Sequence, residues 1–289
     1  MDYSLRGVFD RIYQHPKKIL VVPLFMFILA VSILGYSYVN TGSVVQKGID
    51  FTSGSEIHIP VEESVTADKV KGIFGPESSA RTMTGGGNKW IVVTTTEVYE
   101  QDEVERLLEE AGVSYQSGGL SIRSLGPSVG DAFFLEAQLA ALVAILIMSA
   151  VIFIAFRSIV PSLAVIFAAL TDILVAMAGM SILGIDLSLG ALAALLMLLG
   201  YSVDTDILLS TRVLKQKKED LDDRIWDSVL TGSTMTFAAI AAFTALYVVS
   251  PAGTLDQISS VIIIGLFADL PITWLGNAFI LKWYVESDL

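Results

Sequence analysis

Apolar residues fill six long stretches of the chain, and polar residues separate these stretches. The apolar runs lie at residues 19–39, 133–156, 159–183, 187–211, 229–250 and 258–281. A helix needs about 20 apolar residues to cross a bilayer, so the pattern predicts six transmembrane helices. One sizeable hydrophilic block, residues 40–131, follows the first run and is long enough to fold by itself.

Within this block, the period of the apolar positions alternates between that of strands and that of helices. In the strand predicted at residues 56–61, Ile57, Ile59 and Val61 share one face. Further strands are expected at 80–84, 90–96 and 113–123, helices at 67–74 and 102–111, and a glycine-rich turn at 85–88. The order βαββαβ predicts an α+β domain of the ferredoxin-like kind, inserted into an all-α membrane bundle of six helices.

Basic residues in the short connections predict how the chain lies in the membrane, because Lys and Arg concentrate on the cytoplasmic side. They occur before the first helix, at Arg157, throughout the segment 212–228 and at Lys282, but not around 184–186 or 250–257. We therefore expect a multi-pass protein of the cytoplasmic membrane with both termini in the cytoplasm. The expected parts are 1–39 (cytoplasmic N-terminus and first helix), 40–131 (extracytoplasmic domain) and 132–289 (helices two to six, with a cytoplasmic loop at 212–228).

Composition narrows the possible chemistry. The first span carries Pro23 and lacks a small-residue cleavage site, so it is expected to be an uncleaved anchor. A net charge of -12 argues against a nucleic-acid partner. Since the chain has no cysteine, disulfides and thiolate metal sites are excluded. His15 and His58 are far apart and are interpreted as surface residues, so no metal or cofactor is expected.

Carboxylates inside the apolar spans are the strongest functional signal, because each costs at least about 2.5–3.5 kcal/mol at the bilayer centre. Asp172 has the small neighbours Ala168, Ala176 and Gly179 at helical spacing, so it is expected to face the bundle interior. No Lys or Arg lies deep in these spans, which favours protonation or a counter-ion from a partner subunit. The candidates for proton coupling are Asp172, Asp204, Asp206 and Asp269.

The two acids of the fourth helix are two positions apart and therefore point roughly 200° away from each other. One is expected to serve a proton route and the other to pair with a cation such as Arg212; the sequence leaves open which does which. Ser202 shares a stripe with Asp206. Around Asp269 stand the supporting residues Thr273 and Asn277, next to Pro271, which should disturb the hydrogen-bond ladder of the sixth helix.

A glycine-flanked segment at residues 47–55 precedes the first strand and fits neither helical nor strand periodicity. It is either a linker or a tight turn packed against the membrane helices. Its sequence Gly48-Ile49-Asp50-Phe51-Thr52-Ser53-Gly54 resembles the G-I-D-F-x-G-G motif of SecF proteins, in which Gly48, Asp50, Phe51 and Gly54 are the matching site residues.

A second motif strengthens this resemblance. Residues 200–206, Gly-Tyr-Ser-Val-Asp-Thr-Asp, followed by Arg212, are similar to the fourth-helix motif G-Y-S-x-N-D-T-x5-R of SecF, and the Thr/Ser-rich segment 231–236 is similar to its fifth helix. The bacterial pattern has Asn and Asp where this chain has Asp204 and Thr205, so the acid is displaced by one position. With this displacement, and with Asp269 and Ser53, the chain resembles an archaeal-type member of the family.

The resemblance implies half of a transporter of the resistance-nodulation-division superfamily. It implies an auxiliary subunit, not an enzyme, that acts with a SecD partner in the membrane and helps the SecY channel export polypeptides using the proton-motive force. Two other classes are weighed. A homodimeric exporter of lipids or small hydrophobic molecules would have a large apolar cavity, and an intramembrane aspartyl protease would need a G-x-G-D motif, which this sequence lacks.

Overall fold

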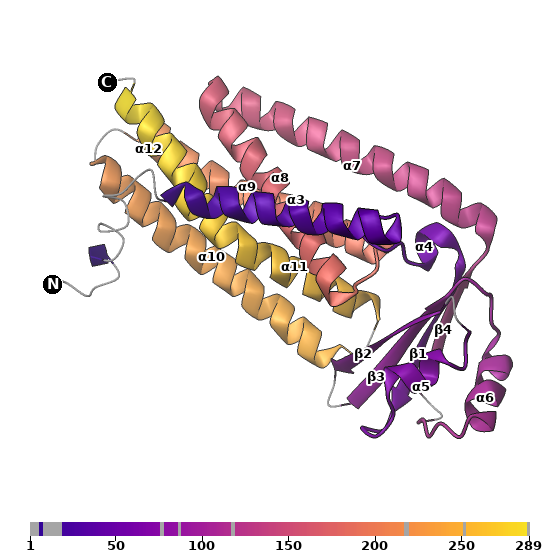
Figure 1. Cartoon of the computed structure of the whole chain (residues 1–289). Coiled ribbons are helices and arrows are strands. Elements are labelled where there is room, and N and C mark those ends of the chain that lie inside the picture. Colours follow the sequence, from indigo (N-terminus) through magenta and orange to yellow (C-terminus); the bar gives the residue numbers. More distant parts are fainter. Residues whose placement is uncertain are drawn as a thin grey trace.

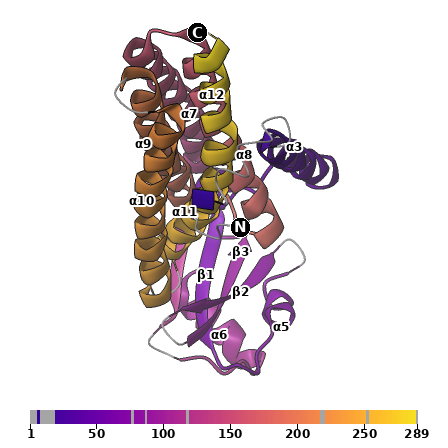
Figure 2. The same ribbon diagram turned by 90° about the vertical axis from the view of Figure 1, so that its left-hand side faces the viewer.

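A computed structural model describes residues 6–7, 19–75, 78–85, 88–116, 119–216, 220–250 and 253–287. His15 and part of the expected glycine-rich turn lie outside these residues. The described chain forms a bundle of long helices with a small sheet domain at one end, and the C-terminal helix ends on the opposite side of the bundle (Figure 1, Figure 2).

Six helices in the described chain are long and apolar enough to cross a membrane, which confirms the predicted spans. They are α3 (Val21–Thr41), α7 (Pro127–Phe156), α8 (Ile159–Leu183), α9 (Leu189–Lys215), α10 (Leu221–Val249) and a last helix made of α11 (Thr254–Pro271), the π-helix η1 (Ile272–Asn277) and α12 (Ala278–Ser287). The connection expected over 212–228 is shorter, because α9 continues to Lys215 and α10 begins at Leu221.

Three helices form the centre of the bundle. About half of the most apolar stretch is buried in α8, α9 and the last helix (50%, 50% and 56%), against 17%, 6% and 17% in α3, α7 and α10. The outer helices therefore direct most of their apolar surface outward, as expected of chain that faces lipid or another subunit.

Glycines allow the central helices to approach closely. A Cβ at Gly179 of α8 would lie 2.7 Å from Ile264 of α11, and one at Gly265 of α11 would lie 2.2 Å from Leu198 of α9. Ala176 is fully buried on the face of α8 that also carries Asp172. The predicted small-residue face of the third helix is therefore a packing surface.

The domain contains β1 (Gly54–Val61), α5 (Ala67–Lys71), β2 (Ser79–Gly85), β3 (Asn88–Thr95), α6 (Gln101–Glu110) and β4 (Ser121–Leu125). All neighbouring strands are antiparallel, in the order β2-β3-β1-β4. Two elements are shorter than expected: α5 ends at Lys71, and β4 begins at Ser121, because residue Tyr115 makes only an isolated bridge, to Val61.

The two faces of this sheet bury different kinds of side chain. One face packs Ile57, Ile59, Ile91 and Val93 against the helices, including Leu108 of α6. The helices lie on the side of the sheet away from the bundle (Figure 1). Because side chains alternate along a strand, the other face carries Glu56, His58, Arg81 and Thr94, and it is turned toward the ends of the membrane helices.

The packing of Gly232 gives a test of the bundle. A Cβ there would lie 2.4 Å from the indole ring of buried Trp274, whereas a Cβ at Gly200 would meet nothing within 4 Å. Gly232→Ala should therefore destabilise the protein by about 1–3 kcal/mol through overpacking. Gly200→Ala is the matched control and should leave the melting temperature in mild detergent unchanged or slightly higher. Equal melting temperatures for the two variants would contradict this packing.

Candidate functional site

Three of the four predicted acids meet in the middle of the bundle. Asp172 of α8, Asp206 of α9 and Asp269 of α11 each have no exposed surface. The Ser202 hydroxyl donates a hydrogen bond to Asp172 Oδ2 at 2.5 Å. The Thr205 hydroxyl lies 3.5 Å from Asp269 Oδ2, a contact that the sequence did not suggest.

The last helix links two of these carboxyl groups. The Thr273 hydroxyl lies 3.1 Å from Asp206 Oδ1 and 3.0 Å from Asp269 Oδ1, and the Asn277 amide donates to Asp206 Oδ1 at 2.7 Å. A threonine hydroxyl carries a single proton. It can therefore donate to one of the two carboxyl groups at a time, and the other contact needs a proton from the carboxyl itself.

A local change of helix type brings these groups together. Pro271 has no backbone N–H, so the regular ladder cannot continue through it. The helix passes into the π-helix η1 directly after Pro271 rather than ending there. Single π-turns often occur at functional sites, and here the π-turn contains both Thr273 and Asn277.

The cluster contains no basic counter-ion among the residues that the structure describes. Asp172, Asp206 and Asp269 form no ion pair with Lys or Arg there. Asp172 Oδ1 and Asp206 Oδ2 are buried without a hydrogen-bond donor in the described chain. An isolated charge buried in this way is costly, and a bound proton removes that cost.

Asp204 and Arg212 lie apart from the cluster. Asp204 is exposed on the outer surface of α9, on the opposite side from Asp206, as the two-residue spacing predicts. The expected ion pair with Arg212 is wrong: within the described part of the chain Arg212 pairs with neither acid, and it lies roughly 9–12 Å further along the helix.

The glycine-flanked segment is a joint between the domain and the bundle, not a free linker. It forms the short helix α4 (Ile49–Thr52). The Gly48 N–H donates to Leu187 O at 2.8 Å, and the Leu187 N–H donates to Gln46 O at 2.7 Å. A Cβ at Gly48 would lie 3.1 Å from Leu187 O, so this backbone approach is suited to glycine.

Asp50 is the polar centre of this joint. Its carboxylate is fully buried, and Oδ2 accepts a 2.8 Å hydrogen bond from the N–H of Leu189, the first residue of α9. Oδ1 lies 2.6 Å from the Arg123 guanidinium of β4. A negative charge at a helix N-terminus is favourable, so one side chain holds α4, α9 and the sheet together.

The remaining motif residues have clear backbone or packing roles. The Phe51 ring packs edge-on against Phe134 of α7 at 5.5 Å. Gly54 has φ +115°, and a Cβ there would lie 1.9 Å from Thr95 O, so no other residue fits without a rearrangement. Ser53, with φ +69°, occupies a left-handed conformation that favours the glycine of the family motif.

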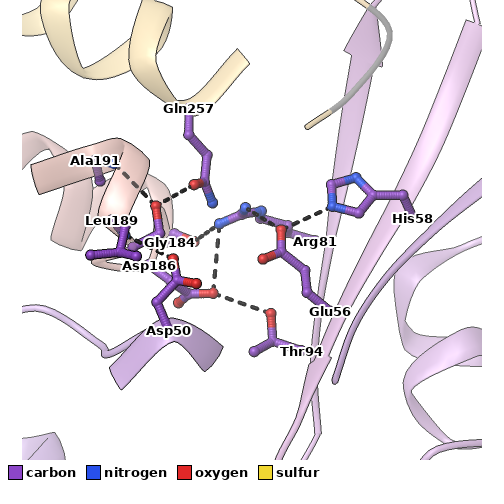
Figure 3. A network of polar contacts seen from close by, with 11 residues as sticks. Asp50, Glu56, His58, Arg81, Thr94, Gly184, Asp186, Leu189, Ala191 and Gln257 are labelled. Carbon is purple, nitrogen blue, oxygen red and sulfur yellow. Dashed lines mark hydrogen bonds and ion pairs between the residues drawn. The ribbon is translucent and has the colours of Figure 1, made fainter. Parts of the chain in front are cut away.

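A second polar contact joins the domain to the connection between α8 and α9 (Figure 3). Arg81 of β2 donates to Gly184 O at 3.0 Å and lies 3.7 Å from Asp186 and 3.9 Å from Glu56. His58 lies 3.0 Å from Glu56 Oε1, and the Thr94 hydroxyl donates to Asp186 at 3.2 Å. The interpretation of His58 as a surface residue is therefore wrong, since it is 8% exposed.

The carboxyl groups of this contact differ in their environments. Burial alone would raise the pKa of Glu56, but the hydrogen bond and positive charge of His58, with Arg81 and Arg123, bring its pKa below the ordinary 4.5. Burial raises the pKa of Asp186 above its ordinary value, and Arg81 and Thr94 only partly oppose that rise. Glu56 is therefore the better-compensated anion of the two.

The lowered pKa of Glu56 predicts how the stability of the protein changes in acid. Because the pKa of Glu56 is lower in the folded than in the unfolded chain, its carboxylate stabilises the fold above pH 4.5. That stabilisation is lost as the pH falls through the folded-state pKa. Glu56→Gln should lower the melting temperature at neutral pH and flatten its decline on acidification. An unchanged acid profile in Glu56→Gln would disprove this role. Glu62→Gln, at an exposed residue directly after β1, is the control.

Comparisons with known proteins match both the sequence and this arrangement. Residues 103–287 match the family model for the C-terminal part of the protein export membrane protein SecD/SecF. The protein-export membrane protein SecF of Pyrococcus furiosus is 36% identical over 275 residues, covering 94% of this chain and 92% of the relative. That of Methanothermobacter thermautotrophicus is 36% identical, covering 96% and 95%.

A solved structure shares the fold. The crystal structure of SecDF from Thermus thermophilus, described as a translocon-associated membrane protein, superposes with a TM-score of 0.73 at 19% identity. The match covers 99% of this chain but 39% of that longer chain. With a family model spanning most of its length and several relatives above 30% identity, the chain belongs to the SecD/SecF family of protein-export membrane proteins.

Proposed function

We propose that this chain is an auxiliary subunit of the Sec export machinery that uses the proton-motive force, together with a SecD-like subunit, to promote movement of polypeptides across the membrane. Membership of the SecD/SecF family supports the export role. The buried cluster of Asp172, Asp206 and Asp269, which has no basic counter-ion in the described chain, carries the proposal of proton coupling.

Proton binding and release at this cluster changes the contacts between three helices. When Asp206 or Asp269 is protonated, the carboxyl supplies the donor that the shared Thr273 hydroxyl lacks, and α9 and η1 are held together. When both are ionised, two like charges compete for one donor. Repulsion in a low-dielectric interior then favours separation of the helices.

Helix α9 transmits this change to the domain. The same helix carries Ser202 and Asp206 in its interior, and its first residue, Leu189, is held by Asp50. At 1.5 Å per residue, roughly 26 Å of regular helix separates Leu189 from Asp206. A tilt of α9 therefore moves Asp50 and, through Arg123, the sheet.

The domain is the proposed contact for the exported polypeptide. Its strand order β2-β3-β1-β4 with helices after β1 and β3 is that expected of a ferredoxin-like fold, and this supports assignment to that class. The distribution of Lys and Arg supports an extracytoplasmic location for residues 40–131 and cytoplasmic termini.

A second subunit completes the proposed transport unit. The solved relative has a chain more than twice as long as the matched part, which supports a SecD-like partner for this six-helix chain. The exposed surface of α9 that carries Gly200, Tyr201 and Asp204 is the proposed contact. An acid exposed at membrane depth needs a polar or basic neighbour, and a partner helix would supply it.

Secretion of a reporter protein tests proton coupling. Asp172→Asn, Asp206→Asn and Asp269→Asn remove one ionisable group each while keeping the shape of the side chain. Each should reduce secretion at least about tenfold, the effect of roughly 1.4 kcal/mol on a coupled equilibrium. Asp227→Asn, on the exposed surface of α10, is the matched control and should secrete normally.

Several outcomes would exclude this mechanism. Normal secretion by all three buried-site variants would exclude coupling through the cluster. Proton uptake that depends on an added small molecule, in vesicles lacking SecY and SecD, would instead support an exporter. Asp204→Asn should leave the buried cluster intact and weaken association with the second subunit, because Asp204 is exposed and lies outside the cluster.

The ion pair between Asp50 and Arg123 predicts which of two substitutions destabilises the protein more. Arg123→Leu leaves the Asp50 carboxylate buried without its ion pair and should destabilise the fold by up to about 3 kcal/mol. Asp50→Asn leaves no buried charge and keeps an oxygen for the Leu189 N–H, so it should melt at a higher temperature than Arg123→Leu. Both should reduce secretion, because both loosen the sheet from α9. Normal secretion by a folded Asp50→Ala variant would contradict transmission through this joint.

A further inference from the structure

An apolar groove lies between α7 and the pair α8 and α9. Its volume is about 250 Å³. Its walls include Phe134, Ala141 and Ile145 of α7 and Leu192, Leu196 and Leu199 of α9. Apart from Gln138, every lining side chain is apolar. Such a surface offers water few hydrogen-bond partners, so the groove is suited to a hydrocarbon chain.

The position and length of the groove match one leaflet of a bilayer. It begins at the domain-side end of the bundle, where Phe51 and Leu187 line it. From Phe134 to Ile145, helix α7 rises roughly 16 Å. Half of the hydrocarbon core of a bilayer is about 15 Å thick, so the groove extends from the domain-side interface to near the midplane.

The size of the groove suits a slender occupant. At roughly 30 Å³ for a group the size of water, it accommodates about eight methylene groups, which is the inner part of one acyl chain.

A cation lies at the mouth of the groove. Lys47 is an exposed residue, and its ammonium nitrogen lies 3.6 Å from the centroid of the Phe134 ring, which lines the groove. Within the described residues Lys47 forms no ion pair with a carboxylate. Its charge is therefore available to an anionic group at the level of the lipid headgroups.

We propose that the groove is a binding site for a phospholipid of the domain-side leaflet, with its phosphate at Lys47 and one acyl chain between α7 and α9. Bound there, the chain fills the space between the outer helix α7 and the central helices. Ile173, which follows Asp172, and Leu199, one turn before Ser202, both line the groove. The lipid therefore packs against the helices that hold the Asp172–Ser202 hydrogen bond.

Photo-crosslinking tests this proposal. The full chain, with any subunit that co-purifies, is placed in vesicles of equal parts phosphatidylcholine and phosphatidylglycerol that contain a trace of phosphatidylglycerol with a diazirine on its acyl chain. After irradiation, mass spectrometry of peptides should find adducts concentrated on the groove-lining residues of α7 and α9. Lys47→Glu should reduce these adducts at least about fivefold, since one basic residue near an anionic surface contributes about 1 kcal/mol.

Two matched variants separate the groove from general lipid contact. Ala141→Phe places a ring inside the groove and should abolish the adducts on α9, whereas Ala140→Phe places the same ring on the exposed side of α7 and should retain them. Melting temperatures verify that both variants fold. Adducts spread evenly around α7, or equal labelling in the two variants, would overturn the proposal. Labelling unchanged in Lys47→Glu would overturn the headgroup contact.

Discussion

The structure depends on a single buried carboxylate, that of Asp50, which binds the N-terminus of α9 and the guanidinium of Arg123 at the same time. A buried charge is tolerated only where its partners compensate it. The backbone contacts between Gln46, Gly48 and Leu187 hold it at that position. Because α9 also carries Ser202 and Asp206, the contact with the domain and the acid cluster lie on the same helix.

The two polar contacts of the domain are made with the connection between α8 and α9 and with the residue that follows it. Asp50 binds the first residue of α9, and Arg81 binds Gly184 and lies beside Asp186, just before that helix begins. Ser188 lies between them; its hydroxyl accepts from the Ala191 N–H and donates to Gln257 of α11. The N-terminal end of α9 is thus fixed to the sheet and to α11, while its middle is held by side-chain hydrogen bonds to Asp172 and Asp206.

Periodicity predicted the parts of the fold that follow from local sequence. The spans, the inward direction of Asp172 and the opposite directions of Asp204 and Asp206 all come from helix geometry. Long-range partners do not follow from spacing. Arg123, 73 positions after Asp50, meets it only because β1 and β4 pair. The alternation of Glu56 and His58 with Ile57 and Ile59 indicates that the strand has a polar face. It does not indicate that this polar face is buried.

The acid cluster has more acceptors than donors in the described chain, and Pro271 and the π-turn lie beside it. Thr273 lies four residues after Asp269, at the spacing at which side chains on a helix meet. Thr273 and Asn277 both lie in the π-turn, and both side chains contact Asp206 of the neighbouring helix α9. One hydroxyl proton then serves two carboxyl groups, while Asp172 Oδ1 and Asp206 Oδ2 have no donor in the described chain. In the proposed mechanism a bound proton would supply the missing donor, and the distorted part of the last helix carries the groups that this proton would link.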